Sequence, residues 1–170
     1  MKAVQYYTTQ QLKEMTANRK KEFSSFFQKM KKKKPPRLDQ AVHALHDEAF
    51  SYFNCLDCAN CCASISPIIT DKDAGRLARK VKMKPSEFIS RYLYMDEDQD
   101  YVFRQSPCPF LMADNCCSVY QDRPKACREY PHTDRNRFYQ IGALTLKNCE
   151  ICPVVYAITE ELIRANTLTE

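Results

Sequence analysis

Four cysteines within eight residues place the strongest constraint on what this chain can fold into. They form the run Cys55-Leu56-Asp57-Cys58-Ala59-Asn60-Cys61-Cys62. A C-x2-C-x2-C run lets three thiolates converge on one centre while the intervening amides point toward sulfur, which is how cubane iron–sulfur clusters are commonly held. Zinc also binds C-x2-C pairs, so the spacing leaves both metals open. Because adjacent side chains tend to diverge, we expect Cys61 and Cys62 to serve different centres, or one of them not to be a ligand.

Six further cysteines lie downstream of this run, at Cys108, Cys116, Cys117, Cys127, Cys149 and Cys152. Cys108 and Cys152 are each followed by proline, as is the remote ligand of ferredoxin-type runs, and this favours an iron–sulfur cluster. Sulfur-only ligation suits iron–sulfur and zinc centres. It disfavours calcium, magnesium and iron sites built from histidine and carboxylate.

Five disulfides in a secreted protein are the alternative explanation for ten cysteines. The first residues contain no apolar stretch of signal-peptide length, and no window elsewhere is apolar enough to span a bilayer. We therefore expect a soluble, cytoplasmic protein. In a reducing compartment, clustered thiols favour metal or redox chemistry over structural bridges.

Helical spacing of apolar residues predicts a mainly α fold: a small helical domain organised around a cysteine-rich metal-binding core, with minor irregular or short β segments. Helices are expected over residues 10–33 after an N-cap at Thr9, over 38–53, after a capping box of Thr70 and Asp73, and from Pro85, Pro124 and Pro153. A short extended piece is expected at 101–103. We divide the chain into an N-terminal basic helical extension, 1–36, and a cysteine-cluster metal-binding domain, 37–170.

The net charge of +5 is concentrated near the N-terminus. The first 50 residues hold eleven Lys and Arg against five Asp and Glu, with Lys29 and Lys31 to Lys34 directly before Pro35-Pro36. Such a run can contact nucleic acid or another anionic surface. The commoner arrangement is a solvated helix end, where lysines meet the negative end of the helix dipole and proline stops the helix.

The cysteines and their neighbours resemble the CxxCxxCC zinc- or iron-chelating domain family, also called YkgJ-type cysteine cluster proteins. The resemblance covers residues 50–165 and is carried by the 55–62 run, Pro107-Cys108-Pro109-Phe110-Leu111, Cys117-Ser118-Val119-Tyr120, Arg123-Pro124, Cys127-Arg128-Glu129-Tyr130-Pro131 and Cys152. It implies eight metal ligands, Cys55, Cys58, Cys61, Cys62, Cys108, Cys117, Cys127 and Cys152. Cys116 and Cys149 fall outside its pattern, and Ala59 stands where the family often has glycine.

Three functions follow as alternatives. The first is an iron–sulfur protein, with a [4Fe–4S] cluster as the expected cofactor and a redox or accessory role; the second is a structural zinc module. Larger members of the family resemble lysine N-methylases, which makes an iron–sulfur enzyme the third. The chain has no glycine-rich nucleotide loop and no C-x3-C-x2-C radical motif. A redox sensor would need free thiols of low pKa, for which Cys116 and Cys149 are the candidates.

Other polar residues near the cysteines have two readings each. His132 is either a ligand or a solvated loop residue, and His43 and His46, three apart on a helix, are either a metal pair or surface residues. Arg123 and Arg128 either cap helices and pair with acids, or offset the charge of an anionic thiolate cluster.

Overall fold

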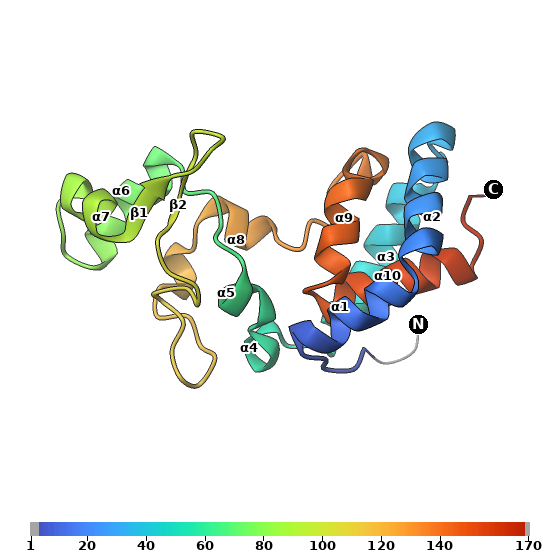
Figure 1. The fold of residues 1–170 in the computed structure, drawn as a ribbon, viewed down its shortest axis with the longest axis horizontal. Coiled ribbons are helices and arrows are strands. Elements are labelled where there is room, and N and C mark those ends of the chain that lie inside the picture. Colours follow the sequence, from blue (N-terminus) through green and yellow to red (C-terminus); the bar gives the residue numbers. More distant parts are fainter. Residues whose placement is uncertain (1–3, 169–170) are drawn as a thin grey trace. The chain divides into compact units, whose positions relative to one another are not determined.

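The computed structural model describes residues 4–168 and divides into two compact units. The helical unit comprises residues 1–55 and 131–170, and the cysteine unit comprises residues 56–130. Residues 1–3, at the start of the predicted region 1–36, and residues 169–170, at the end of the predicted region 37–170, lie outside the described residues. The predicted mainly α fold is confirmed, since a single two-stranded sheet accompanies the helices in the part of the chain described (Figure 1).

The helical unit is a bundle of helices around an apolar core. It contains α1 (Thr9–Asn18), α2 (Lys20–Lys33), α3 (Leu38–Phe50), the 3-10 helix η2 (Phe138–Ile141), α9 (Gly142–Cys149) and α10 (Pro153–Arg164). α2 packs on α9, and α10 packs on both α9 and α3. Fully buried side chains from early and late segments meet in this core, among them Leu12, Phe23, Met30, Val42, Phe138, Ile158 and Leu162. Residues on both sides of the predicted 36/37 boundary therefore share one core, and that boundary stays a prediction.

The predicted single helix over 10–33 is wrong, because the chain breaks at Arg19. Arg19 has φ −111° and ψ 10°, ends α1 and precedes α2. Its side chain pairs with Glu22 at 2.7 Å and with Glu160 of α10. The N-cap is Thr8 rather than Thr9, since Thr8 forms a capping box with Gln11.

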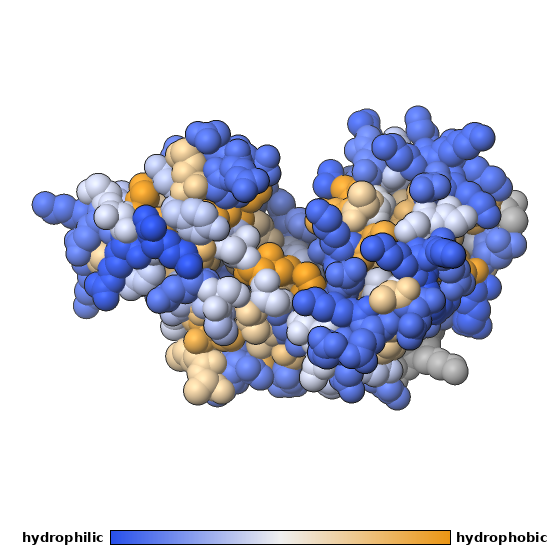
Figure 2. Space-filling view, viewed as in Figure 1, coloured by the Kyte–Doolittle hydropathy of each residue, from blue (hydrophilic) through white to orange (hydrophobic). Residues whose placement is uncertain are grey.

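The lysine-rich end of α2 has the predicted form. Lys31, Lys32 and Lys33 occupy its last turn, Lys34 follows with φ 47°, and all four are exposed. Hydrophilic side chains cover this end of the helix in the space-filling view (Figure 2). The cations thus lie where the helix dipole favours them.

Helix α9 was not predicted from the sequence. Its buried face includes two polar residues, Thr145 and Asn148. The Thr145 hydroxyl donates to the Ile141 carbonyl at 2.9 Å, and the Asn148 side-chain amide donates to the Pro131 carbonyl at 3.4 Å. Polar residues on a buried face hide the apolar spacing by which a helix is recognised. Its last residue, Cys149, is fully buried.

The cysteine unit is smaller and has its own core. α4 (Cys55–Cys58) leads into it, followed by α5 (Asn60–Ser64), α6 (Asp71–Lys80), α7 (Pro85–Tyr92), β1 (Leu93–Met95), β2 (Tyr101–Phe103), η1 (Tyr120–Asp122) and α8 (Lys125–Glu129). β1 and β2 are antiparallel, with Leu93 opposite Phe103. Buried residues from Ile69 to Val119 form one apolar cluster, against which Cys108 and Cys117 pack.

Most predicted helix starts are confirmed. Thr70 and Asp73 form the capping box of α6, and proline stands at the first position of α7 and α10. Pro124 is the N-cap of α8, which carries Cys127, and β2 spans the predicted extended piece. Between Val4 and Leu168, none of the helices combines the length and apolar character needed to cross a membrane.

The two glycines give a matched test of this packing. A Cβ on Gly142 would lie 2.9 Å from Cβ of Phe27, whereas one on Gly75, inside α6, would meet nothing within 4 Å. We predict that Gly142→Ala destabilises the helical unit by about 1–3 kcal/mol through overpacking. Gly75→Ala should stabilise the cysteine unit by up to about 1 kcal/mol through helix propensity. Urea unfolding followed by circular dichroism measures both, and equal effects of the two substitutions would contradict the packing described.

Candidate metal centre

The CxxCxxCC run folds as two short helices joined by a left-handed residue. Cys55 and Cys58 are the ends of α4, and Cys61 and Cys62 lie in α5. Ala59 joins the helices with φ 50° and ψ 8°, a region that glycine adopts freely and alanine does not. Ala59 therefore occupies a backbone conformation that glycine would adopt more easily.

The Cys108 segment runs beside α5. The Cys108 amide donates to the Cys62 carbonyl at 2.9 Å, and Ser106 Oγ donates to the Ala63 carbonyl at 3.1 Å. From Cys108 the chain makes a hairpin in which Leu111 bridges to Cys117. Cys108 is thus fixed to the run by a backbone hydrogen bond, and Cys117 is fixed to the segment that follows Cys108.

Four thiols in the cysteine unit lie close enough to act on one another electrostatically. They are Cys62, Cys108, Cys117 and Cys127, and each of the six pairs among them interacts. Cys58 interacts with Cys62, and Cys61 Sγ lies 4.0 Å from Cys62 Sγ. The two sulfurs therefore lie side by side rather than diverging, while the expectation that Cys61 and Cys62 serve different centres, or that one is not a ligand, stays a prediction. We call Cys62, Cys108, Cys117 and Cys127 the thiol group.

Backbone amides donate to several of these sulfurs in one repeated pattern. The amide two residues downstream donates to the sulfur at Cys58, Cys108 and Cys117, from Asn60, Phe110 and Val119 respectively. Leu111 donates a second amide to Cys108. Hydrogen bonds of this kind stabilise a thiolate more than a thiol, and in iron–sulfur proteins they tune the reduction potential.

Burial sets the protonation of most of the thiols. Desolvation raises the pKa of Cys58, Cys108 and Cys117, and it raises that of Cys127 to about 12, with the neighbouring thiols adding to the effect at Cys127. Metal ligation requires thiolates. A metal that binds these cysteines must therefore displace their protons.

Cys62 is the exception. Its hydrogen bond with Cys61 lowers the Cys62 pKa to about 7, against the effect of burial, and the Arg123 charge lowers it further. Cys62 is therefore a thiol that is already partly ionised near neutral pH.

Arg123 is the cation of this site. Its Nε donates to the Tyr120 carbonyl at 2.9 Å, and its guanidinium lies 3.6 Å from the centre of the Tyr120 ring. From there its charge favours the thiolates of Cys62, Cys117 and Cys127. Arg128 instead donates to the Arg123 carbonyl at 2.7 Å, a structural contact.

The two cysteines outside the family pattern do not have the low pKa of a redox sensor. Cys149 is fully buried in the helical unit, contacts Thr159 Oγ1 at 3.4 Å, and burial raises its pKa to about 12. Desolvation and the Asp114 carboxylate raise the pKa of Cys116. The prediction that these two are the reactive low-pKa thiols is wrong, because apolar burial and a nearby anion both disfavour a thiolate.

The remaining predicted ligands lie in the helical unit. Cys55 is exposed and is the residue after which the chain enters the cysteine unit. Cys152 is buried and is the N-cap of α10. Cys55 is joined to Cys58 through α4, whereas Cys152 belongs to a different unit from the thiol group. Their membership of the centre stays a prediction.

The three histidines belong to the helical unit. His46 Nδ1 contacts Thr133 Oγ1 at 2.7 Å, and His43 Nε2 contacts the Arg135 carbonyl at 3.2 Å, so each ring is engaged within the helical unit. His132 lies in a loop with φ 68°. Over residues 4–168, no three His, Cys, Asp or Glu side chains are arranged as a ready site for one metal ion.

The donor set itself fits a thiophilic metal. The thiol group and its neighbours Cys58 and Cys61 offer sulfur, with amide donors directed at the sulfurs. Sulfur ligands suit zinc and iron–sulfur clusters and do not suit magnesium or calcium. The sulfur donors of the cysteine unit therefore suit the zinc or iron–sulfur centre that the sequence implies.

Comparison with protein families agrees with this chemistry. The model of the CxxCxxCC family, described as "Putative zinc- or iron-chelating domain", matches residues 54–153, more than half of the chain. The chain belongs to the CxxCxxCC family. The matched region holds all eight predicted ligands and leaves out α1, α2 and α3. Comparisons with curated proteins and with solved structures give no match.

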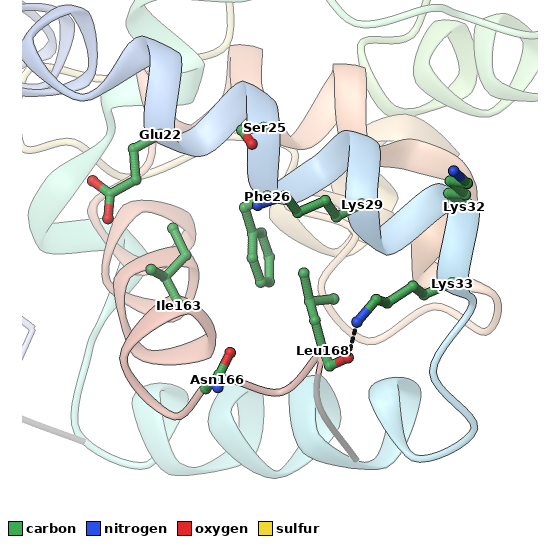
Figure 3. Close-up of a pocket in the computed structure, with 9 residues that line it drawn as sticks. All are labelled: Glu22, Ser25, Phe26, Lys29, Lys32, Lys33, Ile163, Asn166 and Leu168. Carbon is green, nitrogen blue, oxygen red and sulfur yellow. Dashed lines mark hydrogen bonds between the residues drawn. The ribbon is translucent and has the colours of Figure 1, made fainter.

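A pocket in the helical unit of this CxxCxxCC protein has a different character. It has a volume of about 730 Å³ and is lined by Phe26 and Ile163 together with Lys29, Lys32 and Lys33 (Figure 3). Lys33 Nζ donates to the Leu168 carbonyl at 2.9 Å across it. The described residues that line it include no cysteine.

Sequence reasoning missed Asp73 and Arg76 as neighbours of the centre. Arg76 donates to the carbonyls of Asp122 and Arg123, just before α8. The only local signal is the spacing of three between Asp73 and Arg76, which is common on helix surfaces. Contact with residues 122–125 is tertiary and leaves no periodic pattern.

The left-handed Ala59 gives a test of the loop. Ala59→Gly should leave unfolding free energy within about 1 kcal/mol of the native protein, because glycine adopts φ 50° without strain but loses a buried methyl group. Ala59→Val should destabilise by more than about 2 kcal/mol, because a β-branched side chain is strained there. Chemical unfolding of the two variants decides the point, and equal stability would show that residue 59 is not left-handed.

The ionisation of Cys62 can be measured in reduced, metal-free protein. We expect its alkylation rate to rise with pH and level off above pH 7, while that of Cys127 still rises at pH 9. Cys61→Ala should move the Cys62 midpoint upward, since it removes the hydrogen bond that lowers the pKa. Peptide mapping by mass spectrometry gives both rates. A Cys62 midpoint at or above the ordinary thiol value would contradict the arrangement.

Proposed function

We propose that this CxxCxxCC protein binds an iron–sulfur cluster, with [4Fe–4S] as the expected type, and has a redox or accessory role in the reducing cytoplasm. The observation that supports the proposal is that four thiols of the cysteine unit lie within electrostatic reach of one another, with backbone amides donating to the sulfurs of Cys108 and Cys117. Four thiolates are the ligand number of such a cluster. The C-x2-C-x2-C run and the Cys-Pro pairs favour iron over zinc.

The proposed ligands are the eight family cysteines. Within the cysteine unit we assign the thiol group as the principal set, with Cys58 and Cys61 beside it and Cys55 and Cys152 as further ligands. A protein with eight thiolate ligands has enough for more than one centre. Cys116 and Cys149 are excluded from the set.

The surrounding residues have defined tasks toward the bound group. Arg123 offsets negative charge, the amides of Phe110 and Val119 hold sulfur orientation, and the buried cluster behind Cys108 and Cys117 limits water access. An iron–sulfur cluster, when bound, supplies one-electron chemistry. Its partner is then a protein that donates or accepts electrons, and the lysines at the end of α2 are the proposed contact for an anionic surface.

Structural zinc is the second candidate. The cysteine unit has a small core against which two ligand cysteines pack, and metal ligation can supply on the order of 10 kcal/mol to a small domain. In that case the metal would tie α5, the 108–117 hairpin and α8 together without exchanging electrons.

Protein purified without oxygen separates the two candidates. We predict stoichiometric iron with acid-labile sulfide and a visible charge-transfer spectrum, because thiolate-ligated iron absorbs there and zinc does not. Colourless protein with full zinc and no sulfide would establish the zinc alternative.

Cysteine substitutions test the ligand set in the same preparation. Cys117→Ser and Cys127→Ser should lower iron and sulfide content at least severalfold, because each removes a ligand. Cys116→Ser and Cys149→Ser are the matched controls and should retain the native content. Loss of iron in Cys149→Ser as complete as in Cys127→Ser would show that the assignment is wrong.

A further inference from the structure

One buried carboxylate connects α6 to α8, the helix that carries Cys127. Asp73 is 2% exposed, and its Oδ2 accepts from Thr70 Oγ1 at 2.7 Å and from the Thr70 amide at 3.2 Å. Its Oδ1 accepts from Arg76 Nη2 at 2.6 Å and from the Lys125 amide at 3.2 Å. Because Lys125 is the first residue of α8, the carboxylate that completes the capping box of α6 also fixes the start of α8.

Arg76 holds the same segment from its other side. Nη2 donates to the Arg123 carbonyl at 2.7 Å, and Nε donates to the Asp122 carbonyl at 3.2 Å. Arg76 therefore donates to three acceptors at once: the Asp73 carboxylate, the carbonyl at the end of η1, and the carbonyl of Arg123. An arginine is suited to this because its donors lie in a rigid plane and can serve several acceptors at once.

Helix α8 has little else to fix it. It has only five residues, Lys125–Glu129, and none of them is buried. A helix this short is not stable by itself, and because Ala126 and Cys127 are only partly buried, packing alone does not fix its position. Its position, and with it the position of Cys127, depends on hydrogen bonds to residues 122–125.

We propose that Asp73 and Arg76 are positioning residues of the metal centre, which hold residues 122–125 so that Cys127 lies with Cys62, Cys108 and Cys117. The inference rests on the proposed function for its consequence in metal binding. The pair touches no sulfur itself and acts through the α8 backbone. Outer residues that orient metal ligands typically change metal affinity by about 10- to 100-fold when they are replaced.

The first experiment needs no metal. In reduced, metal-free protein, Arg76→Gln should increase the alkylation rate of Cys127 at least severalfold while leaving that of Cys108 unchanged, because only the α8 segment is released. Arg79→Gln is the matched control, an exposed arginine on the same helix, and should alter neither rate. Unchanged Cys127 reactivity in Arg76→Gln, with native circular dichroism, would overturn the positioning role.

The second experiment is a double-mutant cycle with Co²⁺ as the probe. Co²⁺ affinity is measured from the sulfur-to-cobalt absorption in the native protein, Arg76→Gln, Cys127→Ser and the double variant. If Arg76 acts through Cys127, Arg76→Gln lowers affinity about 10- to 100-fold in the native background and has no further effect in Cys127→Ser. Equal losses in both backgrounds would show a general stabilising role and overturn the proposal.

Two milder variants can be used if Arg76→Gln does not fold. Arg76→Lys keeps one donor and Asp73→Asn keeps the shape of the carboxylate, so both should weaken Co²⁺ binding less than Cys127→Ser does and lose this effect in its background. An effect that persists in the Cys127→Ser background would again contradict positioning. Absence of thiolate absorption in the native protein would refute the proposed function, while the alkylation rates would still decide whether the pair holds α8.

Discussion

The partial burial of four thiols within electrostatic reach of one another is the constraint on which the cysteine unit depends. Desolvation disfavours their thiolates, and each thiolate disfavours the next, as the pKa of about 12 at Cys127 shows. A bound cation reverses both effects, because it exchanges each proton for a metal–sulfur bond. Metal binding at this centre is therefore coupled to proton release. Arg123 and the amide donors contribute the stabilisation that the chain can offer without a metal.

The two units are stabilised in different ways. The helical unit has an ordinary apolar core, in which Cys149 behaves as a small buried side chain hydrogen-bonded to Thr159. The cysteine unit places its partly buried thiols on short helices and a hairpin, and two of them, Cys108 and Cys117, pack against its apolar cluster. Hydrogen bonds add to this packing: Cys108 to α5, and Arg76 to the segment before α8. Precise placement of the sulfurs follows from those bonds.

Features that depend on neighbouring residues could be predicted from the sequence, whereas features that depend on contacts between distant residues could not. The capping box at Thr70 and the prolines at the starts of α7, α8 and α10 act within one turn, and all were predicted correctly. The break at Arg19 involves an ion pair with Glu160, far along the chain, and α9 buries polar residues. Neither leaves a periodic pattern.

The same distinction applies to the candidate site. The 55–62 run indicates a metal centre by spacing, whereas Cys108, Cys117 and Cys127 were assigned through the family resemblance. That the three act on Cys62 and on one another is visible only in the structure. Asp73 and Arg76 were missed because their partners are backbone groups about 50 residues away.

We propose that the cysteine unit binds a thiophilic metal through sulfur alone. X-ray absorption spectroscopy at the metal edge of anaerobically purified protein measures this directly, because the fine structure gives the ligand atoms and any neighbouring metal. We predict a first shell of sulfur at about 2.3 Å, as for thiolate ligands, with an iron–iron scattering path from a cluster. A first shell made of nitrogen or oxygen would contradict the account.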